Sequence, residues 1–115
     1  MNMDDIISWA SIDGLEKTMG RDPARAFAKR LLVFLEAKVA EIPAAFAAQD
    51  ADAIRSCVHK LASNAAALGA LKLSAAAREI EALCHAGNVD QAAAQEAAFS
   101  ALAAQSLDIL RQRLT

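Results

Sequence analysis

Apolar positions recur along most of the chain at the spacing of amphipathic helices. The clearest stripe falls within roughly 80° at 100° per residue; it comprises Ile54, Val58, Leu61, Ala65 and Leu68. Small and polar side chains share the rest of this segment with one imidazole, namely Arg55, Ser56, His59, Ala62, Ser63 and Ala66. The pattern therefore predicts a helix with a buried face and with His59 in a clearing of small residues on the solvent side.

Capping and stop signals divide the chain into helices. Acidic residues that precede an apolar run can cap the free N–H groups, and glycines that follow it end the helix. In the first half they predict a lead-in helix over residues 1–10, a helix from Ser11 or Asp13 to Met19 ended by Gly20, and a long helix with Asp22 at the N-cap and Pro23 first in the helix. In the second half they predict the histidine helix from Asp50 or Asp52 to about Leu68 and Gly69, a helix from Leu71 or Lys72 to Ala86 and Gly87, and a last helix from Asn88 or Asp90 to about Arg113.

The long helix after Pro23 carries large apolar residues that we expect to line its core face: Phe27, Leu31, Phe34 with Leu35, and Val39. Pro43 lies inside this helix and removes one backbone hydrogen bond. A kink is therefore expected near residues 39–43.

Four long helices joined by short loops pack as antiparallel neighbours. The 115 residues are 56% hydrophobic and include 30 alanines, which suits one helical domain with close helix contacts. The predicted fold is all-α: an antiparallel up-down four-helix bundle at residues 21–115, with short helical additions at residues 1–20, in a single domain spanning residues 1–115.

Charge and hydropathy exclude several classes of function. The net charge of −2 and the lack of a basic stripe argue against nucleic-acid binding. No apolar run approaches the ~20 residues that span a bilayer, and the N-terminus opens acidic where a signal peptide would be basic. We expect a cytoplasmic protein that binds neither nucleic acid nor membrane, with Cys57 and Cys84 reduced.

Two thiols and two imidazoles make a zinc site an alternative to consider: Cys57 is near His59 in the sequence, and Cys84 is next to His85. A zinc site would need all four side chains to converge. Cys57 and His59 project about 160° apart on one helix, so we predict no metal site. His85, in the last turn of its helix, is expected to interact with the helix C-terminus.

The run HKLASNAAALGA, from His59 to Ala70, resembles the histidine-containing phosphotransfer (Hpt) domain of bacterial phosphorelays. That family places a leucine, a lysine and a glycine shortly after its histidine, then a Ser/Ala-rich stretch and Leu-Gly-Ala. The likeness extends over about residues 10–113 and includes Gly20-Arg21-Asp22-Pro23, Phe34 at a core phenylalanine position, Leu73, Ile80-Glu81 and Gly87-Asn88.

This sequence departs from the family pattern at two positions. The family's lysine is Ala62 here, and the glycine after it is Ser63, which is still small enough to keep the histidine accessible. The missing lysine removes a cation from beside the imidazole. Arg55 shares the face of His59 and is expected to supply part of that charge, with Lys60 as a less well-placed candidate. Ser63 is a candidate hydrogen-bonding partner of the ring or the phosphoryl group.

The resemblance implies that His59 is the phosphoacceptor, taking a phosphoryl group from an aspartyl phosphate on a receiver domain and passing it to another. It implies response-regulator receiver domains and/or a hybrid histidine kinase as partners, with Mg²⁺ on the partner and no cofactor on this chain. We also expect a monomer, although nothing in the sequence itself distinguishes a monomer from a dimer. The chain has no nucleotide-binding motif, so we expect no ATP-dependent kinase activity of its own. The candidate docking residues around His59 are Ala62, Ala66, Lys72 and Arg78, the last two also being possible helpers of Arg55.

Two alternatives remain open. The missing lysine is compatible with a phosphorylation-dead relative that only binds or inhibits. A helical scaffold or dimerisation domain would leave His59 as an ordinary solvated side chain.

Overall fold

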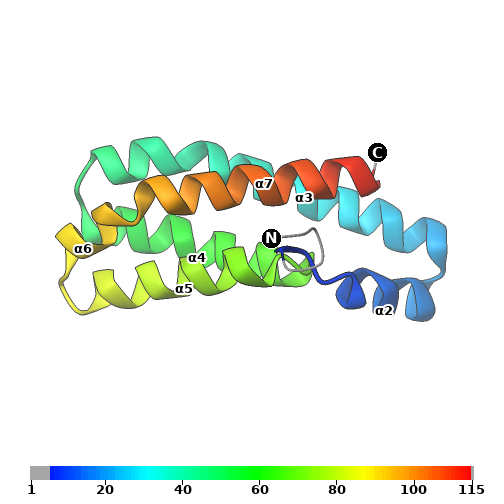
Figure 1. Cartoon of the computed structure of the whole chain (residues 1–115). Helices are drawn as coiled ribbons and strands as arrows, with labels where there is room; N and C mark the ends of the chain where they lie inside the picture. Colours follow the sequence, from blue (N-terminus) through cyan, green and yellow to red (C-terminus); the bar gives the residue numbers. More distant parts are fainter. Residues whose placement is uncertain (1–5, 115) are drawn as a thin grey trace.

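The computed structural model describes residues 6–114, which fold into helices without any strand in that range (Figure 1). The elements are α2 (Ala10–Met19), α3 (Arg21–Ala47), α4 (Ala51–Ala67), α5 (Leu71–His85), α6 (Val89–Ala94) and α7 (Glu96–Leu114). The all-α prediction is confirmed. None of the helices within these residues is both long and apolar enough to cross a bilayer.

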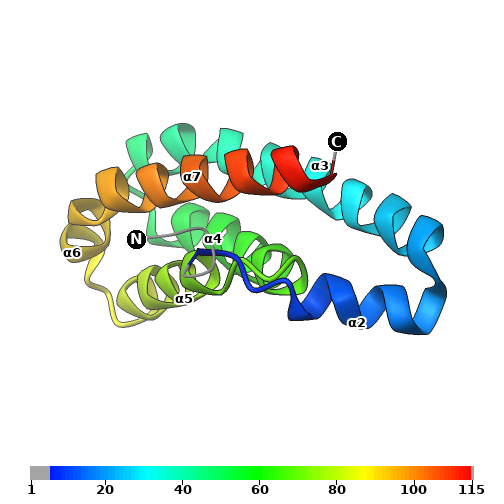
Figure 2. The ribbon, with the colours of Figure 1, turned by 45° about the vertical axis from the view of Figure 1, so that its right-hand side comes forward.

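Four long helices form the bundle. Each contacts two neighbours in the cyclic order α3, α4, α5 and α7. Successive members run in opposite directions (Figures 1 and 2), so the bundle is antiparallel as predicted. Helix α3 extends beyond the others, and α2 packs along its N-terminal part.

The core face of α4 is the predicted one. Its stripe is fully buried at every position, namely Ile54, Val58, Leu61, Ala65 and Leu68. Leu73 and Ile80 of α5 and Leu110 of α7 belong to the same apolar cluster. Burial of this stripe fixes how α4 is rotated, and therefore which of its side chains reach solvent.

Helix α3 buries a face that overlaps the predicted one only in part, since Leu35 is buried as predicted. Its buried residues are Ala24, Ala28, Leu32, Leu35, Ile42 and Phe46. Phe27 and Phe34 are instead 39% and 61% exposed, and Leu31 and Val39 are only partly buried. The assignment of Phe27 and Phe34 to the core was wrong, because alanines make several faces of this helix apolar and large residues alone do not identify the buried one. Pro43 lies within α3, which continues to Ala47.

The predicted ends of α4 and α5 are confirmed. The Asp50 side chain caps α4 by accepting a hydrogen bond from the Asp52 N–H at 2.9 Å. Gly69 and Gly87 follow the two helices with φ of 85° and 82°. These left-handed conformations suit glycine and end each helix at the expected place.

Other helix ends differ from prediction. Helix α2 begins at Ala10, directly after Trp9. Gly20, and not Asp22, is the N-cap residue of α3, so Pro23 is its third residue. The predicted last helix is two helices, α6 and α7, separated at Gln95. Glycine and proline are the clear helix-ending signals in this sequence, and neither residue occurs at this break.

The N-terminal segment packs on the α4–α5 connection. Residues 1–5 of the predicted lead-in helix lie outside the described residues, and from Ile7 to Trp9 the chain is not helical, which corrects the prediction there. The Ser8 N–H donates a hydrogen bond to the Gly69 carbonyl oxygen at 2.7 Å. A Cβ atom at Gly69 would lie 1.9 Å from the Ser8 carbonyl oxygen, so glycine is required there for close approach as well as for backbone conformation.

Candidate functional site

His59 stands on the solvent side of α4. Its side chain is 58% exposed, whereas Val58 next to it is fully buried. Cys57 faces inward and is buried. The rotation of α4 expected from the apolar stripe is thus confirmed at the position that carries the chemistry.

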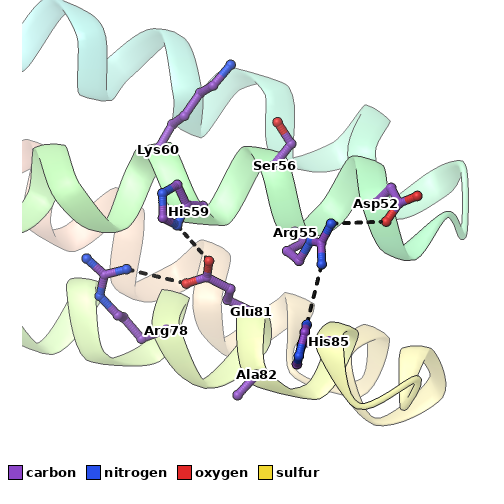
Figure 3. A pocket seen from close by; sticks show the side chains of 9 residues that line it. All are labelled: Asp52, Arg55, Ser56, His59, Lys60, Arg78, Glu81, Ala82 and His85. Carbon is purple, nitrogen blue, oxygen red and sulfur yellow. Dashed lines mark hydrogen bonds and ion pairs between the residues drawn. The ribbon is translucent and has the colours of Figure 1, made fainter.

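Glu81 of α5 holds the imidazole. The Nδ1 atom of His59 lies 2.6 Å from Oε2 of Glu81 (Figure 3). A carboxylate oxygen only accepts, so the proton of the neutral ring is assigned to Nδ1 and the lone pair to Nε2. Glu81 therefore selects the tautomer in which Nε2 is the nucleophilic atom. Sequence reasoning noted Glu81 only as part of the family likeness and missed this contact.

Arg78 shares the same carboxylate. Its Nη1 atom lies 3.3 Å from Oε1 of Glu81, one turn earlier on α5. Glu81 thereby links the imidazole of His59 to the guanidinium of Arg78. Within the described residues, Arg78 is therefore the cationic side chain that shares a hydrogen-bonding partner, Glu81, with His59.

Arg55 points along α4 toward other partners. Its guanidinium lies 3.4 Å from Oδ1 of Asp52 and 3.5 Å from Nδ1 of His85 (Figure 3). An arginine only donates, so this long contact favours a lone pair on Nδ1 of His85 and its proton on Nε2. The two histidines are therefore held differently: His59 presents a lone pair outward and His85 an N–H group.

These side chains line a groove of about 580 Å³ between α4 and α5, formed by Asp52, Arg55, Ser56, His59, Lys60, Arg78, Glu81, Ala82 and His85 (Figure 3). A second groove, of about 600 Å³, lies between α3 and α4 and is lined by Leu31, Phe34, Lys38, His59, Lys60, Ser63 and Asn64. His59 and Lys60 belong to both. The imidazole therefore stands on a ridge that is open from two sides.

The other residues predicted for the site are Lys60, Ser63, Ala66 and Lys72. Lys60 points away from Glu81 and toward the α3 side in Figure 3. The hydroxyl of Ser63 donates to the backbone carbonyl of His59 at 3.4 Å, not to the ring. Ala66 is half-buried on α4, and Lys72 is exposed at the start of α5 outside both grooves.

Ala62 is not on the exposed face. It is fully buried, and its carbonyl oxygen accepts a hydrogen bond of 2.9 Å from the Ser74 hydroxyl of α5. At 100° per residue Ala62 is displaced about 60° from His59, which is enough to turn it under α5. The expectation that Ala62 forms part of the docking surface was wrong.

The two cysteines are buried and free. Burial raises the pKa of both thiols, and the Glu41 carboxylate also raises that of Cys57. Over residues 6–114, no three His, Cys, Asp or Glu side chains are arranged to hold a metal ion.

Fold and site together define a helical-bundle protein with an exposed imidazole that is oriented by a carboxylate. The sequence matches the Hpt domain family over residues 26–113, and the chain belongs to that family of phosphorelay phosphotransfer modules. The fold is similar to the crystal structure of histidine-containing phosphotransfer protein B (HptB) from Pseudomonas aeruginosa PAO1. The TM-score is 0.83 at 20% identity, over 95% of this chain and 94% of that one. The comparison with curated proteins gave no match.

Proposed function

We propose that this protein is a phosphorelay intermediate whose phosphoacceptor is Nε2 of His59. The observation that carries the proposal is the 2.6 Å hydrogen bond from Nδ1 of His59 to Glu81, on a ring that is 58% exposed. It leaves the Nε2 lone pair directed at solvent, where a receiver domain can approach.

The transfer is a nucleophilic displacement. The Nε2 lone pair attacks the phosphorus of an aspartyl phosphate, the N–P bond forms, and the P–O bond to the aspartate breaks. The aspartate leaves as a carboxylate, and the Nδ1 proton stays between the ring and Glu81. The reverse displacement by the aspartate of another receiver passes the phosphoryl group on.

Charge on the phosphoryl oxygens needs nearby cations. Mg²⁺ bound by the partner receiver supplies part of this charge, so the chain requires no cofactor of its own. Arg78, held beside the ring through Glu81, is the better placed of the two arginines, since Arg55 is engaged by Asp52 and His85. These two side chains stand in for the lysine that is absent at position 62.

The proposal includes a cellular setting. The chain acts as a monomer in the cytoplasm, takes its phosphoryl group from a receiver or a hybrid histidine kinase, and does not phosphorylate itself from ATP. It binds neither nucleic acid nor membrane.

A phosphorylation-dead binding module is the second candidate function. Alanine at position 62 favours it, because the family's lysine is missing and the position is buried under α5. In that case the grooves beside His59 would bind a receiver without chemistry.

One experiment separates these functions. The protein is mixed with a panel of isolated receiver domains carrying ³²P-labelled aspartyl phosphate and Mg²⁺, and label on the protein is followed over time. Phosphotransfer predicts acid-labile, base-stable label, which is typical of phosphohistidine. Receiver binding without label would support the phosphorylation-dead module, and neither binding nor label would support a scaffold.

A further inference from the structure

Arg55 stands one turn before His59 on α4, but its guanidinium turns away from the imidazole (Figure 3). Its Nη2 atom lies 3.4 Å from Oδ1 of Asp52, and its Nη1 atom lies 3.5 Å from Nδ1 of His85. Asp52 precedes Arg55 by one turn on α4, and His85 follows Glu81 by one turn on α5, so both partners lie on the side away from His59. A cation that lines the same groove as His59 is thus held toward the other end of it.

The contact between Arg55 and His85 depends on the protonation state of the imidazole. An arginine donates and does not accept, so the contact requires a lone pair on Nδ1 of His85. A proton taken from solvent would bind at Nδ1, remove that lone pair and leave two cations facing each other. Histidine is the side chain that gains such a proton between pH 8 and pH 5. Acid therefore breaks this contact, and neutral to alkaline pH maintains it.

The charges around His85 come from two helices. Six titratable or charged side chains share the groove with His85, four from α4 and two from α5: Asp52, Arg55, His59, Lys60, Arg78 and Glu81. Within residues 6–114, α6 and α7 contribute no side chain to the lining of this groove.

The two carboxylates of the groove differ in what they already bind. Glu81 is engaged by His59 and Arg78, whereas Asp52 is 86% exposed and faces Arg55. His85 is the last residue of α5, where the free carbonyl groups of the helix interact favourably with a cation. A protonated His85 therefore has favourable surroundings once Arg55 has moved away.

We propose that His85 is a positioning residue for Arg55. The neutral imidazole keeps the guanidinium at the far end of the groove, and the protonated imidazole releases it toward the phosphoryl group on His59. The contribution of Arg55 to transfer is therefore small at pH 8 and larger at pH 6. This inference rests on the proposed phosphotransfer function.

The linkage is measured first in the unphosphorylated protein, without a receiver. ¹⁵N NMR follows the ring nitrogens of both histidines and the Nε–H group of Arg55 from pH 8 to pH 6. We expect the Arg55 signal to shift with the same midpoint as the His85 ring. In His85→Gln, whose amide oxygen accepts from Arg55 at every pH, the Arg55 signal should not shift with that midpoint.

The consequence for transfer is measured with a labelled receiver at low salt, at pH 6, 7 and 8. The rate of the unaltered protein is divided by that of Arg55→Ala, so that titration of His59 and of the receiver cancels. We expect this ratio to be about threefold larger at pH 6 than at pH 8. The ratio of His85→Gln to the His85→Gln/Arg55→Ala double variant should be the same at all three pH values.

Asp52→Asn is the matched control, because it alters the other partner of Arg55 and introduces no group that titrates in this range. Its ratio to the Asp52→Asn/Arg55→Ala double variant should still rise as the pH falls. An equal rise in the His85→Gln pair, or an Arg55 signal that does not follow His85, would overturn the proposal. Linked NMR signals without label from any receiver would support the contact between His85 and Arg55 and contradict phosphotransfer.

Discussion

Glu81 accepts a hydrogen bond from His59 across the α4–α5 hairpin, at 2.6 Å between Oε2 and Nδ1. The contact joins residues 22 positions apart in the sequence. It orients the one exposed imidazole that lies between the two grooves. This pairing occupies Nδ1 of His59 with a carboxylate, whereas Nδ1 of His85 faces the Arg55 guanidinium.

Replacing Glu81 tests whether orientation matters. We expect Glu81→Ala to slow transfer from the receiver about tenfold, which corresponds to ~1.4 kcal/mol for a lost hydrogen bond to a charged group. Glu81→Gln should recover much of the rate, because its amide oxygen still accepts the Nδ1 proton. NMR of the ring nitrogens should show Nδ1–H in the unaltered protein and a tautomer mixture in Glu81→Ala. A Gln variant as slow as the Ala variant would show that charge, not orientation, is what Glu81 supplies.

The two arginines of the α4–α5 groove should contribute unequally. Arg78 shares Glu81 with His59, whereas Arg55 is engaged by Asp52 and His85. We expect Arg78→Ala to slow transfer several-fold at low salt and Arg55→Ala to slow it less, since exposed charges of this kind contribute ~1 kcal/mol or less. Transfer kinetics at low and high salt measure both. A larger effect of Arg55→Ala at low salt would restore it as the main substitute for the missing lysine.

Because Ala62 is buried, a lysine at this position would not simply restore the family's cation beside His59. We expect Ala62→Lys to destabilise the fold by about 2–4 kcal/mol, because it overfills a helix contact and places an ammonium group under α5. Thermal unfolding should occur about 10 °C or more lower. Ala66→Arg, at a half-buried position two turns beyond His59, should impair transfer with little change in melting temperature. A stable Ala62→Lys variant with faster transfer would contradict the packing described here.

Stability should fall at alkaline pH because of the two buried thiols. Burial raises the pKa of Cys57 and Cys84 above the ordinary value of 9.0, so the unfolded chain loses these protons first. The stabilisation is fully present below pH 9 and is lost as the pH rises toward the folded-state pKa. Urea unfolding at pH 8, 9 and 10 measures this loss, and the chain has no tyrosine to titrate in that window. The Cys57→Ala/Cys84→Ala double variant should have a flatter profile; parallel profiles would contradict the assignment.

The sequence predicts those parts of the fold that depend on local signals. The α4 stripe from Ile54 to Leu68 contains large aliphatic residues at helical spacing, and its ends carry Asp50 and Gly69. These signals correctly placed His59 on the exposed side. Alanine, by contrast, is apolar and small on every face, so the sequence did not reveal that Ala24 and Ala28 are buried while Phe27 is exposed.

The arrangement of the site depends on contacts between helices. The meeting of His59 with Glu81, and of Arg55 with His85, is set by the register of the α4–α5 hairpin. That register follows from the turn at Gly69 and from packing such as the Ser74–Ala62 hydrogen bond. Periodicity within one helix carries no information about these distances.

The most direct test of the account identifies the phosphorylated atom. After transfer from a labelled receiver, ³¹P and ¹⁵N NMR of the protein resolves the modified ring nitrogen, with His59→Gln and His85→Gln as matched variants. We predict one phosphohistidine, bonded at Nε2 of His59, absent in His59→Gln and retained in His85→Gln with helical circular dichroism unchanged. Phosphorylation at Nδ1, label that persists in His59→Gln, or no label from any receiver that binds would contradict it.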